Sequence, residues 1–427
     1  MSPRRRLVFL ISLLMLPWPS QAAEQAPFVR EASVPLTLDE AYALALRRSE
    51  DVAIRRELIT ETEGRFLQAF SGALPRASFV WSEKRQDGAG TSAFTLSRVP
   101  ERRFTVTQPL FGGFKEFAAM AGSRSERRQR TFERQRAEQL LLTDVANAFY
   151  LLLEQREELA TFEVIRVALV DRLDELHERE QLGRTRPSEV AGAEAQLRRV
   201  EAELQLVRSR EQAARQLLEF LTGLKTIEAV ADEAHELPML EPQDASLAKA
   251  PQRPDVQAQQ QALQVAKRQV AVARAKLLPT ADVEGNYYTE RVGAAADVDW
   301  DVLLTVDVPI FQGGQAVGAW REAASKARQA QWRAAQVARS ARLDIEQAHT
   351  ELAAALEQHA ALAQALQAAE DNYRLQAADY RLNLVSNLDV LQALQALEDA
   401  RRETLHAYYE AKRLFWRLRV ATGEGLA

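Results

Sequence analysis

Residues 113–182 contain no proline, and this long interval limits the possible folds more than any other feature of the sequence. Apolar residues recur through it mainly in steps of three, four and seven, as in helices that pack along a seam. A helix over this interval would be about 100 Å long at ~1.5 Å per residue. A compact globular domain cannot hold such a helix. Residues 37–73 and 187–221 predict two helices about half as long, which would pack end to end against the long one.

The second half of the chain repeats the first. Pro109 and Phe111 correspond to Pro309 and Phe311, 200 positions later. The same offset relates further pairs, namely Leu182 and Leu382, Val190 and Val390, Leu197 and Leu397, Thr222 and Thr422, and Gly223 and Gly423. Such a repeat indicates an internal duplication. We expect a first repeat over 23–223, a linker in an equatorial region over 224–253, and a second repeat over 254–427.

Each repeat also contains two short segments with the period-two alternation of β-strands. Residues 76–85 and 104–108 predict the first pair, with residues 86–103 as a loop. In the second pair, residues 298–308 place valine, leucine and tryptophan opposite mostly aspartate and threonine. Strands of about ten residues with one apolar and one polar face are typical of membrane barrels. Four strands cannot close a barrel, so three chains would have to share about twelve strands.

Composition limits the class of protein further. The 427 residues include no cysteine, and the net charge is −5 with both signs interspersed, which gives no reason to expect nucleic acid as a partner. Residues 1–22 combine Arg4–Arg6, a short apolar region and small residues before Ala23, which predicts a cleaved signal peptide. The five histidines are scattered, and no catalytic or metal-ligating motif is found. We therefore expect no enzyme activity and no cofactor.

Taken together, the duplication, the segments 108–113 and 308–314 and the turn segment 380–392 resemble the TolC family of outer-membrane efflux proteins. The resemblance covers essentially the whole mature chain. It implies a mixed, mainly α fold: a homotrimer with a shared twelve-stranded β-barrel in the outer membrane lipid and a long α-helical barrel in the periplasm. It also implies a periplasmic membrane-fusion adaptor and an inner-membrane transporter of RND, ABC or MFS type as partners. The function would be efflux or type I secretion.

The resemblance also assigns candidate functional residues at the periplasmic end. Tyr380 and Asp389 match positions of the family's gate, and Ser188 and Glu189 lie at the matching turn of the first repeat. The family's basic gate residue is replaced by Val385, and a second acidic ring position by Gln392, so the electrostatic latch should be weaker. Two turns would contact the adaptor: Leu182, Gly183, Arg184 and Thr185, and Leu382, Asn383, Leu384, Val385 and Ser386.

The remaining candidates are the junctions where each strand pair meets its long helix. They comprise Pro109, Phe111, Gly112 and Gly113 in the first repeat, and Pro309, Phe311, Gly313 and Gly314 in the second. Proline would end the ladder of strand hydrogen bonds, and glycine would permit the sharp change of direction into the helix. An alternative from another class stays open: an exported coiled-coil scaffold or adhesin without channel activity, whose hairpins form a soluble tip.

Overall fold

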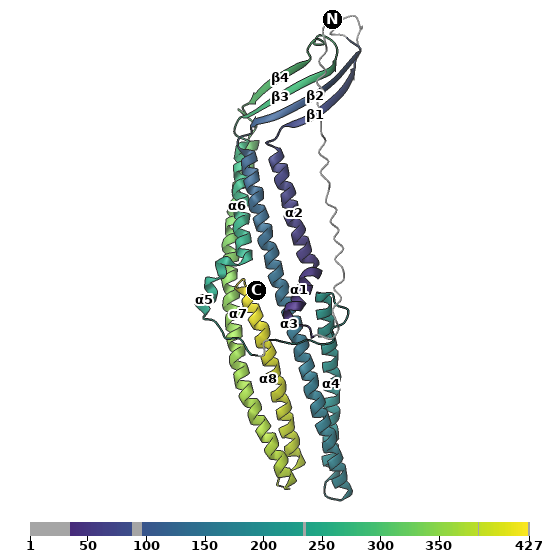
Figure 1. The fold of residues 1–427 in the computed structure, drawn as a ribbon. Helices are drawn as coiled ribbons and strands as arrows, with labels where there is room; N and C mark the ends of the chain where they lie inside the picture. Colours follow the sequence, from purple (N-terminus) through teal and green to yellow (C-terminus); the bar gives the residue numbers. More distant parts are fainter. Residues whose placement is uncertain (1–34, 88–95, 234–235, 383, 426–427) are drawn as a thin grey trace.

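The molecule is an elongated helical body with a curved β-sheet at one end (Figure 1). The computed structural model describes residues 35–87, 96–233, 236–382 and 384–425. The expected signal peptide and Asn383 therefore lie outside the described residues. At the end opposite the sheet, the helices finish in two separate hairpin turns (Figure 1).

Two long helices run the length of the body. Helix α3 covers Lys115–Gln181 and helix α7 covers Gln315–Arg381, each with 67 residues. The long helix predicted from the proline-free interval is therefore confirmed. It begins two residues later than predicted because Gly113 and Phe114 both have positive φ angles, which no right-handed helix contains. At its far end, Gly183 has φ +68° and stops the helix in the same way.

Shorter helices pack on the long ones in two levels. Near the sheet lie α2 (Glu50–Ser71) and α6 (Pro254–Ala275), and near the tips lie α4 (Pro187–Thr222) and α8 (Asn387–Ala421). The prediction of one helix over 37–73 was wrong, because Ser49 separates α1 (Leu38–Arg48) from α2. The Ser49 hydroxyl accepts a hydrogen bond from the backbone N–H of Val52 (3.4 Å), so it caps the second helix.

The sheet is antiparallel with the strand order β1–β2–β3–β4. Its strands are β1 (Arg76–Arg85), β2 (Arg98–Phe111), β3 (Thr280–Arg291) and β4 (Trp300–Asp307). The loop predicted over 86–103 was too long, because residues 98–103 pair with the outer half of β1. Many of these residues are charged, so they do not alternate between apolar and polar side chains. A strand that buries neither face in a core does not need that alternation.

The duplication is visible in backbone conformation as well as in sequence. The order α2–β1–β2–α3–α4 recurs as α6–β3–β4–α7–α8. Gly113 and Gly313 have φ angles of +68° and +58°, and the next residues, Phe114 and Gly314, have +64° and +85°. The same two consecutive left-handed residues therefore start both long helices. Between the repeats, the expected linker contains a short helix, α5 (Gln243–Ala248), and a 3₁₀ turn (Ala250–Gln252).

The buried side chains form several clusters along the body. The largest lies at mid-height, where Phe149 and Leu152 of α3 meet Leu218 of α4, α1 and the C-terminal part of α8. Separate clusters continue toward the tips between α3, α4 and α8. This distribution suits a rod, in which each level is stabilised by the helices that cross it.

Candidate functional site

One face of the sheet exposes a continuous apolar surface. A row of aromatic residues crosses all four strands, since Phe79 pairs with Phe104, Phe104 with Tyr287, and Tyr287 with Trp300. Their side chains are 46–66% exposed. Toward the helices the same face continues with Val106, Val302, Leu304 and Val306, which are all at least 47% exposed. An apolar face of this extent on a protein surface requires lipid or another protein to cover it.

The opposite face of the sheet is polar and internally hydrogen-bonded. The Thr105 hydroxyl donates to Asn286 Oδ1 (2.7 Å), and Asn286 Nδ2 donates to Asp301 Oδ1 (2.9 Å). The Tyr288 hydroxyl donates to the other Asp301 oxygen (2.8 Å). These side chains form a polar ladder across β2, β3 and β4. The predicted division between an apolar and a polar face is therefore present in the fold.

The sheet is open at both sides in the described part of the chain, where β1 pairs only with β2 and β4 only with β3. Unpaired strand edges expose rows of N–H and C=O groups. In a hydrocarbon environment each unsatisfied group is costly, so an apolar-faced sheet of this kind needs further strands to complete it. Identical chains can supply them.

The first junction contains the predicted residues but in different roles. Pro109 does not end its strand: it pairs with Asp282, and β2 continues to Phe111 after a register irregularity. Gly113 lies so close to α6 that a β-carbon added to it would be 2.8 Å from the carbonyl oxygen of Ala275. Gly113 therefore provides both a left-handed backbone and close helix packing.

The second junction has fewer contacts within the chain. Pro309, Phe311 and Gly313 lie in the connection between β4 and α7, after the strand has ended at Asp307. Phe311 is 87% exposed, and a β-carbon added to Gly313 or Gly314 would meet no atom within 4 Å. Together with Phe114 and Phe117 of the first junction, Phe311 forms a second level of exposed aromatic residues. The apolar face of the sheet thus lies between two aromatic levels, as in membrane barrels.

At the opposite end, the two predicted turns form the tips of the helical hairpins (Figure 1). The first contains Leu182, Gly183, Arg184 and Thr185, and the second contains Leu382, Leu384, Val385 and Ser386 in its described part. Leu182, Leu382 and Leu384 are 68–69% exposed. Each tip therefore presents leucine side chains to the surroundings, which suits contact with another protein.

The predicted gate residue Tyr380 is buried within the chain, at 6% exposure, and contacts the other hairpin. The guanidinium carbon of Arg172 lies 3.9 Å from the centre of the Tyr380 ring, and that of Arg179 lies 5.0 Å from it. Both arginines belong to α3, while Tyr380 belongs to α7. Sequence reasoning missed these two arginines because charged residues are frequent all along α3.

Asn387 adds a second connection between the hairpins, and it was also missed. It is 1% exposed, and its Oδ1 accepts hydrogen bonds from Arg172 Nε (3.1 Å) and Nη2 (2.9 Å). Its amide nitrogen donates to the backbone carbonyl of Glu189 (3.5 Å). Glu189 thus contributes its backbone to this contact, while Ser188 beside it is exposed. The signal in the sequence was an asparagine at the first position of a helix, next to the predicted gate.

Asp389 has a local structural role in this chain. One of its carboxylate oxygens accepts hydrogen bonds from the Ser386 hydroxyl (2.7 Å) and backbone N–H (2.9 Å), and Ser386 in turn caps the Asp389 N–H. This capping box begins α8. The hydrogen bonds from Ser386 lower the pKa of Asp389 below its ordinary value. The side chain remains exposed, so the charge is directed to the surroundings.

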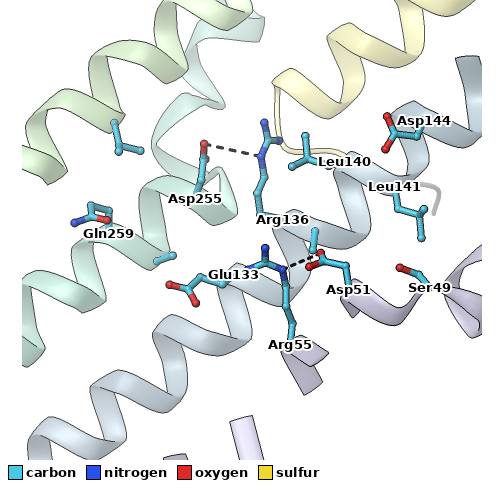
Figure 2. A pocket seen from close by; sticks show the side chains of 13 residues that line it. Ser49, Asp51, Arg55, Glu133, Arg136, Leu140, Leu141, Asp144, Asp255 and Gln259 are labelled. Carbon is cyan, nitrogen blue, oxygen red and sulfur yellow. Dashed lines mark hydrogen bonds and ion pairs between the residues drawn. The ribbon is translucent and has the colours of Figure 1, made fainter. Parts of the chain in front are cut away.

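A charged cavity of 620 Å³ lies where α2 and α6 begin against the middle of α3 (Figure 2). Arg55 pairs with Asp51 (3.1 Å), and Arg136 lies 3.9 Å from Asp255. Burial raises the pKa of Asp144 at its edge. Among the described residues there is no group of three side chains suited to hold a metal ion. The lining of this cavity has charges of both signs, which suits a water-filled space between the two levels of helices.

Comparison with known proteins identifies the second half of the chain. Residues 248–424 match the family model "Outer membrane efflux protein". This segment is similar to outer membrane efflux proteins. The matched domain includes β3, β4 and both helices of the second hairpin. The family matched by this segment is one of efflux proteins and not of enzymes. No curated protein matches the chain.

Solved structures resemble the domain together with the first half of the chain. CusC superposes with a TM-score of 0.81 at 16% identity, covering 93% of this chain and 96% of the other. The outer membrane protein VceC from Vibrio cholerae gives 0.78 at 21% identity (91% and 96%), and the outer membrane channel CmeC from Campylobacter jejuni gives 0.77 at 17% identity (93% and 90%). The predicted fold class is confirmed. No helix of the described residues is long and apolar enough to cross a membrane.

Proposed function

We propose that three copies of this chain form an outer-membrane channel that conducts efflux substrates or secreted proteins from the periplasm to the exterior. The observation that carries the proposal is the sheet, with an exposed apolar face between two aromatic levels, a polar ladder on the other face and two open edges. Three such sheets joined edge to edge give a closed barrel with lipid outside and water inside. The outer membrane efflux protein domain and the solved outer membrane channels of the same fold support it.

In this arrangement the helices extend the channel into the periplasm. The exposed leucines at the two tips (Leu182, Leu382 and Leu384) provide the contact with a periplasmic membrane-fusion adaptor, which links the channel to an inner-membrane transporter of RND, ABC or MFS type. In this proposal the inner-membrane partner, and not the channel, selects the cargo.

The gate follows from the contacts between the two hairpins of one chain. Tyr380 packs under Arg172, and Arg172 also holds the buried Asn387. These contacts keep α7 and α8 close to α3 at the tip, which narrows the tunnel in the trimer. Asp389 contributes an exposed charge at the same level, and Glu189 joins through its backbone. Opening then requires the contacts of Arg172 to break.

The lipid-facing assignment can be tested with two arginine substitutions on β4. Val302 lies on the apolar face and Thr305 on the polar face of the same strand. Arginine facing lipid at the bilayer midplane costs about 2–4 kcal/mol. We expect Val302→Arg to lower the yield of membrane-inserted trimer strongly. Thr305→Arg should leave the yield near wild type and shift the ion selectivity of the pore in planar bilayers toward anions.

Extraction behaviour separates the channel from the alternative of an exported scaffold or adhesin. A channel is recovered from outer membranes only with detergent, as a heat-sensitive trimer that conducts ions. Recovery of the wild-type chain as a soluble periplasmic protein, or equal tolerance of both arginine substitutions, would contradict the proposal.

A further inference from the structure

A band of charged residues continues the apolar face of the sheet beyond its aromatic row. The strand register places Glu83, Arg85, Arg98, Arg102 and Glu290 on the same face as Trp81 and Phe104, on the side away from the helices. Arg102 is two residues beyond Phe104, about 7 Å along the strand, and Arg98 is about 20 Å beyond it. We call Arg85, Arg98 and Arg102 the arginine band.

The arginine band is ordered by contacts on the sheet surface. Arg98 donates from Nε and Nη2 to the two oxygens of Glu83 (2.8 and 3.3 Å), and Arg85 shares the same carboxylate (3.2 Å). Arg102 pairs with Glu290 (3.0 Å), and its guanidinium carbon lies 4.9 Å from the centre of the Trp81 ring. The arginine side chains are nevertheless 80%, 64% and 45% exposed.

The charges on this part of the face do not balance. Among the paired residues of β1, β2 and β3 on this part of the face, three guanidinium groups lie beside two carboxylates, and Glu83 is shared between two of them. Each guanidinium has five N–H donors, and the contacts described above use only some of them. The three side chains are exposed beside an apolar surface, so the donors that these contacts leave unused are accessible to an external ligand. Arginine is well suited to bind phosphate in such a setting, because its planar fork matches phosphate oxygens in a bidentate manner.

We propose that the arginine band binds the phosphate groups of phosphorylated glycolipid in the outer leaflet, while the acyl chains of that lipid cover Phe79, Phe104 and Trp300. The inference rests on the proposed function, since the band lies at the outer leaflet only if the sheet spans the membrane. Two observations on the molecule favour this occupant: the excess of positive charge and its direct continuity with the apolar face. A neutral headgroup would supply no anionic acceptor for the guanidinium donors that Glu83 and Glu290 leave unused.

The test uses the purified full-length trimer in detergent with EDTA, titrated with diphosphorylated lipid A or with its dephosphorylated form. The measurement is the shift in the midpoint of heat dissociation of the trimer. We expect the diphosphorylated lipid to raise the midpoint and the dephosphorylated form to raise it much less. The triple variant Arg85→Gln/Arg98→Gln/Arg102→Gln should lose more than half of the shift, and the corresponding triple lysine variant should retain most of it.

Arg103 provides the matched control, because it lies one residue from Arg102 on the same strand and faces the opposite side of the sheet. Arg103→Gln should keep the full lipid-induced shift. An equal shift for both lipids, or for the triple glutamine variant, would overturn the proposal. Conductance in planar bilayers separates the lipid site from the channel. If the triple glutamine variant conducts normally and keeps the full lipid-induced shift, only the proposed lipid site is ruled out. If the wild-type trimer fails to insert into bilayers, both the proposed channel and the proposed lipid site are ruled out.

Discussion

Arg172 on α3 lies with its guanidinium carbon 3.9 Å from the centre of the Tyr380 ring on α7. The same side chain donates two hydrogen bonds to Asn387 on α8. One arginine thus joins the first helical hairpin to both helices of the second, close to the tips.

The first prediction concerns this contact. Hydrogen bonds to a charged group contribute about 1.5–3 kcal/mol, and about 1.4 kcal/mol changes an equilibrium constant tenfold. Asn387→Ala, which removes the acceptor, should therefore raise the open fraction of the pore about tenfold. Single-channel recording in planar bilayers measures this fraction. Arg198→Gln is the control, because Arg198 is exposed on α4 and pairs only with Glu201 among the described contacts. Equal conductance of wild type and Asn387→Ala would contradict the gate assignment.

The second prediction concerns Asp389, which is the third residue of α8 and the acidic member of its capping box. Hydrogen bonds from Ser386 lower the pKa of Asp389. The contribution of the Asp389 carboxylate to the stability of α8 is therefore complete above the pKa that Asp389 has in the unfolded chain, and it is lost as the pH falls through the lower pKa of the folded chain. The protection factors of the amides at residues 387–391, which are the intrinsic exchange rates divided by the observed rates at the same pH, should therefore be high at neutral pH and fall below about pH 4. In Asp389→Ala, these protection factors should be low at every pH. Because Asp389 is a predicted gate residue, Asp389→Ala should also raise ion conductance or change its cation selectivity, and bilayer recordings of the same variant test that separately.

The third prediction compares equivalent glycines of the two repeats. Gly113→Ala adds a β-carbon 2.8 Å from the Ala275 carbonyl oxygen, whereas Gly313→Ala meets no atom within 4 Å in the chain. Both variants place alanine in the left-handed region of backbone conformation, which costs about 1–2 kcal/mol of stability. Gly113→Ala must in addition displace α6. Its trimer should dissociate at a clearly lower temperature than that of Gly313→Ala. If the order is reversed, neighbouring chains rather than α6 determine which junction is tight.

The fourth prediction concerns Arg253, which is 1% exposed at the start of α6. It bonds to Asp255 (2.6 Å), Asp344 (3.1 Å) and the carbonyl oxygens of Ala341 and Ala421. Removing one partner of a buried ion pair costs about 3–5 kcal/mol. Arg253→Ala should therefore lower the stability of the trimer strongly in denaturant titrations. Arg374→Ala is the control: its side chain is 76% exposed, and such surface pairs contribute about 0–1 kcal/mol.

The fifth prediction concerns Glu398 on α8. Burial, with Asp399 as a further cause, raises its pKa from 4.5 to about 7, while Arg402 and Arg199 oppose the shift. The folded chain therefore binds a proton that the unfolded chain releases, and stability falls as pH rises from about 4.5 through about 7. Glu398→Gln keeps a neutral group at this site. The variant should resist denaturation better than wild type at pH 8 and no better at pH 4; an equal difference at both pH values would rule out titration of Glu398 as the cause.

Much of the architecture could be predicted because it follows from simple periodicities. The long helices come from a proline-free interval, and the faces of the sheet come from alternation in residues such as Trp300 and Asp301. The repeat offset related the two halves before any contact was known. Helix ends were also accessible where a glycine such as Gly183 or a capping threonine such as Thr37 stands in the sequence.

The parts that could not be predicted depend on contacts between distant segments. The break at Ser49 lies between strong helical patterns on both sides, and the packing of α1 in the mid-height core adds to the Ser49 cap in favouring it. Arg172 and Asn387 are 215 positions apart and became a pair only through the fold. Phe114 takes a left-handed conformation that is uncommon for a bulky residue, where the second repeat has Gly314. No local rule would have placed it there.

The unbroken course of α3 and α7 has a mechanical consequence. Among the described helices, only α3 and α7 extend from the tips to the sheet, so these two helices transmit a force between the two ends of the molecule. A helix about 100 Å long resists stretching, and it transmits an axial push with little loss. A force applied by a partner at the tips would therefore reach the base of the barrel through Gly113 and Gly313. A substitution that stiffens or displaces either glycine would therefore change how such a force passes from helix to strand.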